Sequence, residues 1–458
     1  MAGGKKAAKK LTPEEWLEQA LVPVGEQPYA VPENWCWTRI KNVAVILNGY
    51  AFKSQNYVDK GIRIIRITNV QDGYIEDDKP VFYPFENEVE MKKYMLEAGD
   101  LLISLTGNVG RVAFLNNEML PAALNQRVGC LRFNHSFVNK SFLFYYFLRQ
   151  EFQDSCIKNS KGSAQLNMST EWLKSQPVPI PPFNEQQRIA ECIESLFAKL
   201  DEAREKAQAV LDSFELRRSA VLYKAFSGEL TEQWRIKNNM SFSGWKQIKF
   251  GELGLLERGR SKHRPRNDPK LFGGKYPFIQ TGDVARSGMY IVEHSQTLNE
   301  EGMRQSRIFP KGTLCITIAA NIGDVSILTY DCCFPDSVVG FTPNALTSSK
   351  FIYYMMSTIQ RKLEADAPAT AQKNINLKIL NEITIKVPLL DEQDEIINIL
   401  ERVFEKEQQT KNIAETVINQ IDIMKKSILS RAFRGELGTN NPDGENAAEL
   451  LKKIVTMK

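Results

Sequence analysis

Two long stretches of the chain carry apolar residues at alternating spacings of four and three, the pattern of a helix that pairs with another helix. The first stretch follows Pro181 and Pro182, and the second follows Pro388. Residues 184–230 and 391–437 align without a gap and share 14 identities in 47 pairs, so the second stretch repeats the first. We expect two long helices that pair as an antiparallel coiled coil, with two separate core helices as the alternative. The expected pairing residues are Ile189, Ile193, Leu196, Leu200, Val210 and Phe214, then Ile396, Leu400, Val403, Val417, Ile421 and Ile428.

Each repeat carries its own signals for the start and the end of a helix. Asn184 and Asp391 follow the prolines and are the expected N-caps. Gly228 and Gly435 suit the left-handed conformation that ends helices. Each helix should therefore run for about 43 residues, which is roughly 65 Å at 1.5 Å per residue. Polar residues interrupt the two seams at Arg217, Glu407 and Thr410.

The segments that precede the two helices also repeat, in short matching blocks. Residues 37–40 match 245–248, 99–104 match 312–317, and 163–168 match 370–375. Short β-branched runs between glycines and asparagines predict strands at 63–70, 101–105 and 314–319. Helices are predicted at 13–21, with Thr12 as the N-cap, and at 142–152, 350–363 and 447–455.

The fold class that follows is α+β with an internal pseudo-two-fold repeat. Two mixed α/β domains alternate with the two long helices, and paired helices would hold the two domains apart. The predicted segments are an N-terminal extension 1–30, a first mixed domain 31–183, a first helical spacer 184–240, a second mixed domain 241–390, a second helical spacer 391–438 and a C-terminal tail 439–458.

Composition and cysteine usage place the chain among ordinary globular proteins of a reducing compartment. Hydrophobic residues make up 43% of the chain, charged residues make up 25%, and the net charge is +4. There is no apolar run of about 18 residues, so we expect no membrane span. The seven scattered cysteines form no Cys-x-x-Cys pair. We therefore expect free thiols and a cytoplasmic location.

Motifs for catalysis are missing from the sequence. There is no phosphate-binding Gly-x-x-x-x-Gly-Lys-Ser/Thr and no Asn/Asp-Pro-Pro-Tyr/Phe of amino-methyltransferases. The three histidines, His135, His263 and His294, have neither metal-ligand nor triad spacing. A binding protein without catalytic residues or a metal is therefore favoured over an enzyme.

Polar loops of the two mixed domains have the chemistry of DNA contacts. Residues 258–266 place five formal positive charges in nine residues, and the equivalent stretch 48–57 is rich in amide and aromatic groups. Cations suit phosphates, Asn and Gln can pair with adenine, and Arg can pair with guanine. The alternative for Gln165, Asn167, Gln372 and Asn374 is a framework role, because their block occurs in both domains. The DNA-binding candidates are Lys53, Gln55, Asn108, Arg111, Gln126, Arg127, Ser163, Gln165 and Asn167, then Arg258, Arg260, Lys262, Arg264, Arg266, Asn321, Thr370, Gln372, Lys373 and Asn374.

These repeated motifs resemble the specificity subunit of type I restriction–modification systems. The resemblance rests on Pro-x-x-x-Glu-Gln before a long helix that ends in Ala-Phe-x-Gly-Glu-Leu, and on Gly-Ser/Thr-Ala-Gln-x-Asn in the mixed domains; Ala369 replaces the glycine of the second block. It implies that each mixed domain reads one half of a bipartite DNA target. It also implies that the helices dock two methyltransferase subunits, alongside restriction subunits.

By the same resemblance, S-adenosylmethionine, ATP and Mg²⁺ belong to those partner subunits, and this chain holds no cofactor. Three other interpretations stay open at this point: a tandem recognition protein of another DNA-modification defence system, a self-sufficient DNA methyltransferase or nuclease, and a structural coiled-coil scaffold.

Overall fold

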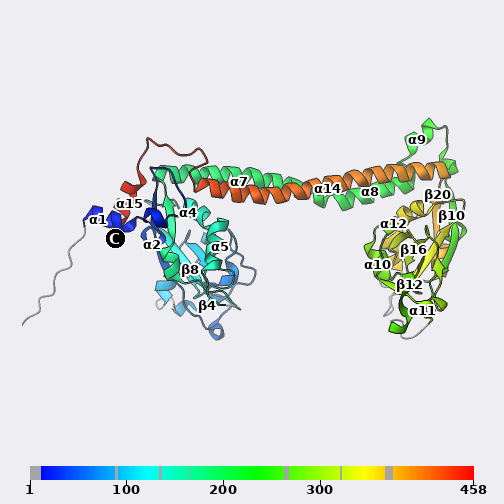
Figure 1. Ribbon diagram of the computed structural model, residues 1–458, viewed down its shortest axis with the longest axis horizontal. Helices are drawn as coiled ribbons and strands as arrows, with labels where there is room; N and C mark the ends of the chain where they lie inside the picture. The colour runs from blue at the N-terminus through cyan, green and yellow to red at the C-terminus, as the bar shows by residue number, and fades with distance from the viewer. Residues whose placement is uncertain are drawn as a thin grey trace, which may run out of the picture. The chain divides into compact units, whose positions relative to one another are not determined.

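A computed structural model describes residues 12–87, 91–133, 137–162, 165–262, 268–319, 322–366 and 375–457. The chain forms two compact units (Figure 1). Unit 1 is Met1–Ala207 together with Thr416–Lys458, and unit 2 is Gln208–Glu415. Each unit contains one mixed domain and a part of both long helical stretches. This division passes through both predicted spacers, because each helix packs partly with one unit and partly with the other.

The mixed domain of unit 1 is built on three small sheets. The largest has the strand order β2-β8-β5-β6 with antiparallel neighbours. A second sheet has the order β4-β3-β7, and β1 pairs with β9 in an antiparallel ladder. The strand bounds are β1 Cys36–Arg39, β2 Ala44–Asn48, β3 Ile62–Ile65, β4 Phe82–Tyr83, β5 Leu101–Ser104, β6 Val112–Phe114, β7 Ala122–Leu124, β8 Val128–Phe133 and β9 Pro177–Ile180.

Unit 2 repeats this plan with an additional strand in each larger sheet. The sheet orders are β11-β19-β16-β17-β13 and β14-β12-β18-β15, and β10 pairs with β20. The core β11-β19-β16-β17 matches β2-β8-β5-β6 strand for strand, so the predicted repeat is confirmed as a repeat of topology. The strand bounds are β10 Lys246–Lys249, β11 Gly254–Arg258, β12 Phe272–Phe278, β13 Tyr290–Ile291, β14 Gln296–Leu298, β15 Ile308–Phe309, β16 Leu314–Thr317, β17 Val325–Leu328, β18 Cys332–Cys333, β19 Val338–Pro343 and β20 Thr384–Val387.

The shorter helices agree with the sequence in part. The first helix, α1 (Pro13–Ala20), has the predicted Thr12 cap, and α15 (Ala447–Thr456) and α12 (Ser349–Asp366) cover the predicted ranges. The single helix expected at 142–152 is wrong, because the chain breaks at Leu148 and Arg149 between α4 (Lys140–Phe147) and α5 (Gln150–Lys158). The strand predicted at 63–70 ends at Ile65, where a turn of 3-10 helix follows. The remaining helices are α2 Ile40–Val43, α6 Thr170–Ser175, α9 Glu232–Lys237, α10 Thr281–Arg286, α11 Glu300–Arg304 and α13 Leu377–Glu382.

The two long helical stretches differ from each other in continuity. The second is one helix, α14 (Leu390–Ala432), of the expected 43 residues. The first is divided into α7 (Phe183–Asp212) and α8 (Phe214–Ser227), so an unbroken helix there was a wrong prediction. The hydroxyl of Ser213 donates to the carbonyl of Val210 at 2.7 Å, and this local bond competes with regular helix geometry.

Where the two helical stretches lie together, they run antiparallel. In unit 1, Lys425 forms an ion pair with Asp201 at 2.5 Å, and three residues along each helix Arg204 pairs with Asp422. As the residue number rises along the first helix, the number of its partner on the second helix falls, so the two helices run in opposite directions. All twelve expected pairing residues are buried or half-buried.

Two of the residues that interrupt the seams come together in unit 2. Burial raises the pKa of Glu407, and the nearby guanidinium groups of Arg218 and Arg217 oppose that rise. The Arg218 guanidinium also lies over the ring of Phe404 at 4.5 Å. The interruption of one seam therefore lies near the interruption of the other, and polar groups placed together in this way favour one register of a coiled coil.

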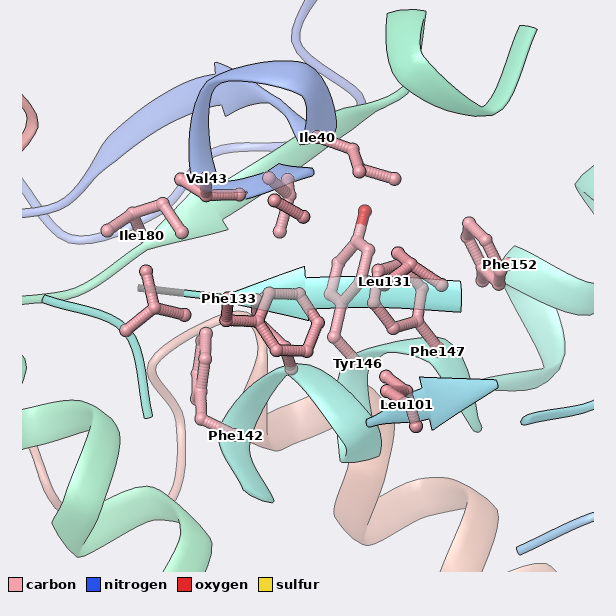
Figure 2. Packing of buried hydrophobic residues seen from close by; sticks show 14 of the residues in the cluster. Ile40, Val43, Leu101, Leu131, Phe133, Phe142, Tyr146, Phe147, Phe152 and Ile180 are labelled. Atoms are coloured by element: carbon pink, nitrogen blue, oxygen red, sulfur yellow. The ribbon is translucent and has the colours of Figure 1, made fainter. Parts of the chain in front are cut away.

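The core of unit 1 joins both ends of the chain. Aromatic side chains of α4 gather with Leu131 and Phe133 of β8 (Figure 2). Leu451 and Ile454 of α15 belong to the same cluster, and Phe433, which follows α14, contacts Tyr146 with ring centroids 5.3 Å apart. The helices α1 and α15 lie side by side (Figure 1), so residues 12–20 and 447–456 are part of unit 1.

The first turn of each long helix contains a buried glutamine that bonds to its mixed domain. The Gln186 amide donates to the carbonyl of Pro181 at 3.0 Å, and its Oε1 accepts the backbone N–H of Asn139 at 2.9 Å. Gln393 donates to the carbonyl of Pro388 at 2.9 Å and accepts from the Thr347 hydroxyl at 3.0 Å. The same side chain therefore performs the same task in both units.

The helix starts correct the predicted N-caps. The helices begin at Phe183 and Leu390, so Asn184 and Asp391 lie inside the first turn. The carbonyls of Pro182 and Leu389 accept the first backbone hydrogen bonds of the two helices, so Pro182 and Leu389 occupy the N-cap positions. The side chains of Gln186 and Gln393 hold those segments, and this makes a side-chain cap at Asn184 or Asp391 unnecessary.

The glutamates beside these glutamines have different partners in the two units. Glu392, 2% exposed, accepts from Arg235 at 2.5 Å and from the Thr231 hydroxyl at 2.7 Å. Glu185, 1% exposed, accepts from the indole N–H of Trp35 at 3.0 Å, and its Oε1 has no partner within the described residues. Burial raises the pKa of Glu185, and the Trp35 hydrogen bond and the Arg188 charge oppose that rise.

We predict unequal losses of stability from the same substitution at the two glutamates. Glu392→Gln leaves the buried Arg235 guanidinium without its counter-charge and should destabilise unit 2 by about 3 kcal/mol. Glu185→Gln removes no ion pair and should change the stability of unit 1 by less than about 1 kcal/mol. Native-state hydrogen exchange of amides in β20 and β9 would measure the two effects, and equal losses would contradict the difference in pairing.

We also predict a pH dependence that arises from Glu185. Because its pKa is raised, the folded chain holds this proton more tightly than the unfolded chain does. Its contribution to stability is complete below the ordinary carboxyl pKa and is lost as pH rises through the raised value. Glu185→Gln should remove this part of the decline in the stability of unit 1 as the pH rises from below the ordinary carboxyl pKa to above the raised value. Unfolding of both proteins across this range would test it, and parallel pH profiles would contradict it.

Candidate nucleic-acid interface

Backbone hydrogen bonds join four loops of unit 1 at one edge of its main sheet. Tyr50 donates to Leu124 at 2.9 Å, and Gln126 donates back to Tyr50 at 3.0 Å. Leu105 donates to Arg127 at 2.9 Å. The bonds that complete the connection run from Gly107 to Leu166 at 2.8 Å and from Met168 to Leu105 at 2.8 Å. We name the surface of residues 49–57, 105–111, 125–127 and 165–168 the first loop face.

A glycine allows two of these loops to approach closely. A Cβ atom on Gly49 would lie 2.2 Å from the backbone of Asn125. Unit 2 has the same arrangement, because a Cβ on Gly259 would lie 2.3 Å from the carbonyl of Pro335. Both glycines directly follow the first strand of the main sheet. No other residue fits at either position without displacing the backbone.

The bonds around Gly259 define a second loop face in unit 2. Arg260 donates to Phe334 at 3.1 Å, and Ile318 donates to Ser337 at 3.0 Å. Each bond has its counterpart in unit 1, so Arg260 stands where Tyr50 stands. We name the surface of residues 259–262, 318–319, 335–337 and 375 the second loop face. The equivalence of 48–57 with 258–266 is therefore supported by strand register, as far as the structure describes these residues.

Some of the predicted DNA-binding residues hold the loops together. Asn167 accepts from the Thr106 hydroxyl at 3.0 Å and donates to the carbonyl of Gln165 at 3.1 Å. The guanidinium of Arg111 donates to Gln71 at 2.5 Å, and turning the Asn108 amide lets it accept from the same group at 3.1 Å. Arg258 donates to the backbone carbonyl of Asp336. For Asn167 this supports the framework alternative, and it gives Arg111, Asn108 and Arg258 a positioning role as well.

Other predicted residues have exposed side chains without a described partner, which we call the uncommitted side chains. These side chains are exposed and have no hydrogen-bond or ion-pair partner within the described ranges. The group comprises Lys53, Gln55, Gln126, Arg127 and Gln165 on or beside the first loop face, and Arg260 and Lys262 on the second. Their DNA contacts stay a prediction. The candidates Ser163, Arg264, Arg266, Asn321, Thr370, Gln372, Lys373 and Asn374 lie outside the described residues.

One feature of the first loop face was missing from the predicted set. Tyr50 is 45% exposed, and its ring lies 5.2 Å from the ring of Tyr94. The ammonium group of Lys93 lies over Tyr94 at 4.9 Å. The aromatic content of 48–57 was a signal for Tyr50, but Tyr94 lies 44 residues further along the chain and only the fold brings the two together.

The described residues form no metal site. No group of three or more His, Cys, Asp or Glu side chains in these ranges is arranged to hold a metal ion. The seven cysteines form no disulfide, and burial raises the pKa of the Cys36 and Cys156 thiols to about 12, which keeps them protonated and unreactive. Across the described ranges, no helix combines the length and apolarity that crossing a membrane requires.

These observations define a class: a duplicated binding protein with an equivalent polar and basic loop face in each unit. Residues 32–211 and 243–419 match the model of the type I restriction modification DNA specificity domain. The chain therefore belongs to the type I restriction–modification specificity family, and it is a DNA-recognition subunit. Specificity subunits of this class are non-catalytic.

Relatives and a solved structure agree with this assignment over nearly the whole chain. The chain is 25% identical to the EcoBI specificity subunit of Escherichia coli over 93% of its own length and 92% of that protein. It is also 25% identical to the EcoKI specificity subunit of E. coli K12, over 93% and 95% of the two chains. The fold is similar to that of the HsdS subunit of Thermoanaerobacter tengcongensis, with a TM-score of 0.64, 18% identity and coverage of 90% and 100%.

We predict that Lys262 contacts phosphate. Lys262→Ala should weaken DNA binding by a similar factor on every sequence and reduce the slope of log K against log salt by about 1. Lys311→Ala is the matched control, because Lys311 is exposed just before β16, at the end opposite the loop face. Binding titrations between 50 and 200 mM salt would measure both variants. Equal slopes for Lys262→Ala and the unaltered protein would contradict the contact.

Proposed function

We propose that each loop face reads one half of a bipartite target in double-stranded DNA. The observation that carries this proposal is the equivalence of the two faces. Both are fixed by the same backbone bonds to the same strands, while the exposed side chains differ: Tyr50 and Gln126 in one, Arg260 and Lys262 in the other. A shared scaffold with different exposed groups suits two related sites that read different sequences.

The chemistry of the uncommitted side chains suits a duplex. Lysine and arginine neutralise phosphates and set affinity, whereas amide and guanidinium groups that reach base edges set sequence preference. A net charge of only +4 makes binding through overall charge weak, so local cations such as Lys262 and Arg127 must supply much of the attraction. Salt dependence and sequence preference should therefore map to different side chains.

The helices have a second role in the proposal: docking two methyltransferase subunits, and with them restriction subunits. Leu216 of α8 is 77% exposed, and Ile423 of α14, its equivalent in the repeat, is 67% exposed. Two equivalent exposed apolar positions suit two copies of one partner. S-adenosylmethionine, ATP and Mg²⁺ would act in those partners, in the cytoplasm, and this chain would contribute recognition alone.

Purification of the tagged chain from its host, with mass spectrometry of bound proteins, tests this proposal. A methyltransferase in about two-fold molar excess should accompany the chain, and methylome sequencing should then show methylated adenines in one bipartite motif. Purification of the chain alone would contradict the partner proposal. A methylome that lacks a bipartite motif when the methyltransferase is bound would contradict the reading of two half-sites.

We predict that the length of the helices sets the distance between half-sites. Seven residues inserted within 203–214, with seven inserted at the facing part of α14, preserve the heptad phase and add about 10 Å. The preferred spacing should grow by about three base pairs, because the bases of one strand are about 3.4 Å apart along the axis. Both half-site sequences should stay the same in a selection from random duplexes. Unchanged spacing, or loss of either half-site, would contradict this role of the helices.

A further inference from the structure

Residues 50 and 260 occupy one equivalent point on the two loop faces. Each directly follows the glycine whose missing Cβ permits the close approach of the neighbouring turn. Each donates its backbone N–H to the last residue before that turn, Tyr50 to Leu124 and Arg260 to Phe334. Each backbone carbonyl is also bonded, to the N–H of Gln126 at 3.0 Å in one face and to the Ser306 hydroxyl at 3.2 Å in the other. The backbone is thus fixed on both sides in both units.

The side chains at this point are exposed and differ in chemistry. Tyr50 is 45% exposed, and Arg260 is exposed with no partner for its guanidinium within the described residues. Arg258, two residues earlier, donates a side-chain hydrogen bond to the backbone carbonyl of Asp336. This bond holds the turn that lies beside Arg260. A fixed backbone with an exposed side chain fits the reading of base edges, because the loop is already ordered and only the side chain must be immobilised when DNA binds.

We propose that residues 50 and 260 are equivalent specificity-determining positions, and that Arg260 reads a guanine in the half-site of unit 2. The planar guanidinium presents two parallel N–H groups that match O6 and N7 of guanine in the major groove. Tyr50 at the same point cannot form that pair and offers an aromatic ring instead, which suits the methyl group of thymine. The inference rests on the proposed function, because it assumes that the loop faces meet DNA.

The competing role for Arg260 is a phosphate contact. Removal of the charge would weaken DNA binding in either role, so such a variant by itself does not distinguish them. Arg260→Lys separates them, because lysine keeps the positive charge but has no planar pair of donors. A phosphate contact would survive this change nearly intact. A guanine contact would lose its preference at one base pair, while the salt dependence would stay close to that of the unaltered protein. Arg260→Ala should lose both the preference and some of the salt dependence.

The experiment is selection from a library of random duplexes by the complete complex with its methyltransferase, followed by sequencing of the bound DNA. For Arg260→Lys we expect at least a roughly tenfold loss of preference for guanine at one position of one half-site. Every other position, and the other half-site, should stay unchanged. Lys262→Ala is the control on the same loop and should weaken binding without altering preference at any position. Tyr50→Ala should change one position of the other half-site, and Tyr50→Phe, which keeps the ring, should not.

The outcomes distinguish a failure of this inference from a failure of the proposed function. If the unaltered complex selects no bipartite sequence, the proposed function fails and the inference fails with it. If it selects a bipartite sequence and Arg260→Lys leaves every preference intact, the inference alone is overturned. Uniform weakening by Arg260→Ala with no positional effect would assign Arg260 to phosphate. Thermal unfolding of the Arg260 variants should match the unaltered protein, because that side chain is exposed and has no partner within the described residues. Tyr50→Ala removes ring contacts with Phe52 and Tyr94, so its unfolding must be compared with that of Tyr50→Phe, which keeps them.

Discussion

A buried glutamine at the first turn of each long helix fixes that helix to its own mixed domain. The side chains of Gln186 and Gln393 are fully buried, and each bonds both to the carbonyl before its own helix and to the segment that leads into an earlier helix of the same domain, α4 or α12. A buried amide left without partners costs about 1–3 kcal/mol, so each bond strongly favours this one geometry. The direction of the helix, and with it the pairing along the coiled coil, depends on this junction.

The neighbouring glutamates show that a repeat can keep a geometry while its electrostatics change. Glu392 forms a buried ion pair with Arg235, whereas Glu185 accepts a single hydrogen bond from Trp35. The segment that supplies Arg235 follows the first helical stretch, and the corresponding segment after α14 continues instead into the loop before α15. The same Glu-Gln sequence therefore forms a buried ion pair in one junction and a single hydrogen bond to a neutral donor in the other.

The loop faces show the same separation between scaffold and variable chemistry. Asn167, Arg111 and Arg258 bond to neighbouring loops and give the faces their shape. Tyr50, Gln126 and Arg260 project from backbone that hydrogen bonds to neighbouring segments already fix. Because framework and exposed groups lie on different residues, exposed side chains can change without disturbing the fold. This arrangement suits a DNA-recognition subunit that carries two copies of one domain.

Much of the fold could be predicted because it depends on local or periodic signals. The heptad spacing gave α14 its full length, the Thr12-Pro13 start gave α1, and Gly228 and Gly435 have the left-handed conformation expected of helix ends. The errors had two sources, contacts between residues distant in sequence and a local hydrogen bond from a side chain. Pro182 and Leu389 cap the long helices because distant residues hold Gln186 and Gln393, and Ser213 interrupts α7 through its own hydroxyl.

The sequence by itself determined the repeat, the helical seams, the family and the positions of the polar and basic loops, because these depend on spacing and residue type along the chain. Only the tertiary structure decided which polar side chains brace the loops and which stay free, since that depends on neighbours from other loops. The sequence contains Tyr50 and Arg260, but the sheet register makes them equivalent, and the close approach at Gly49 and Gly259 places each beside the same turn.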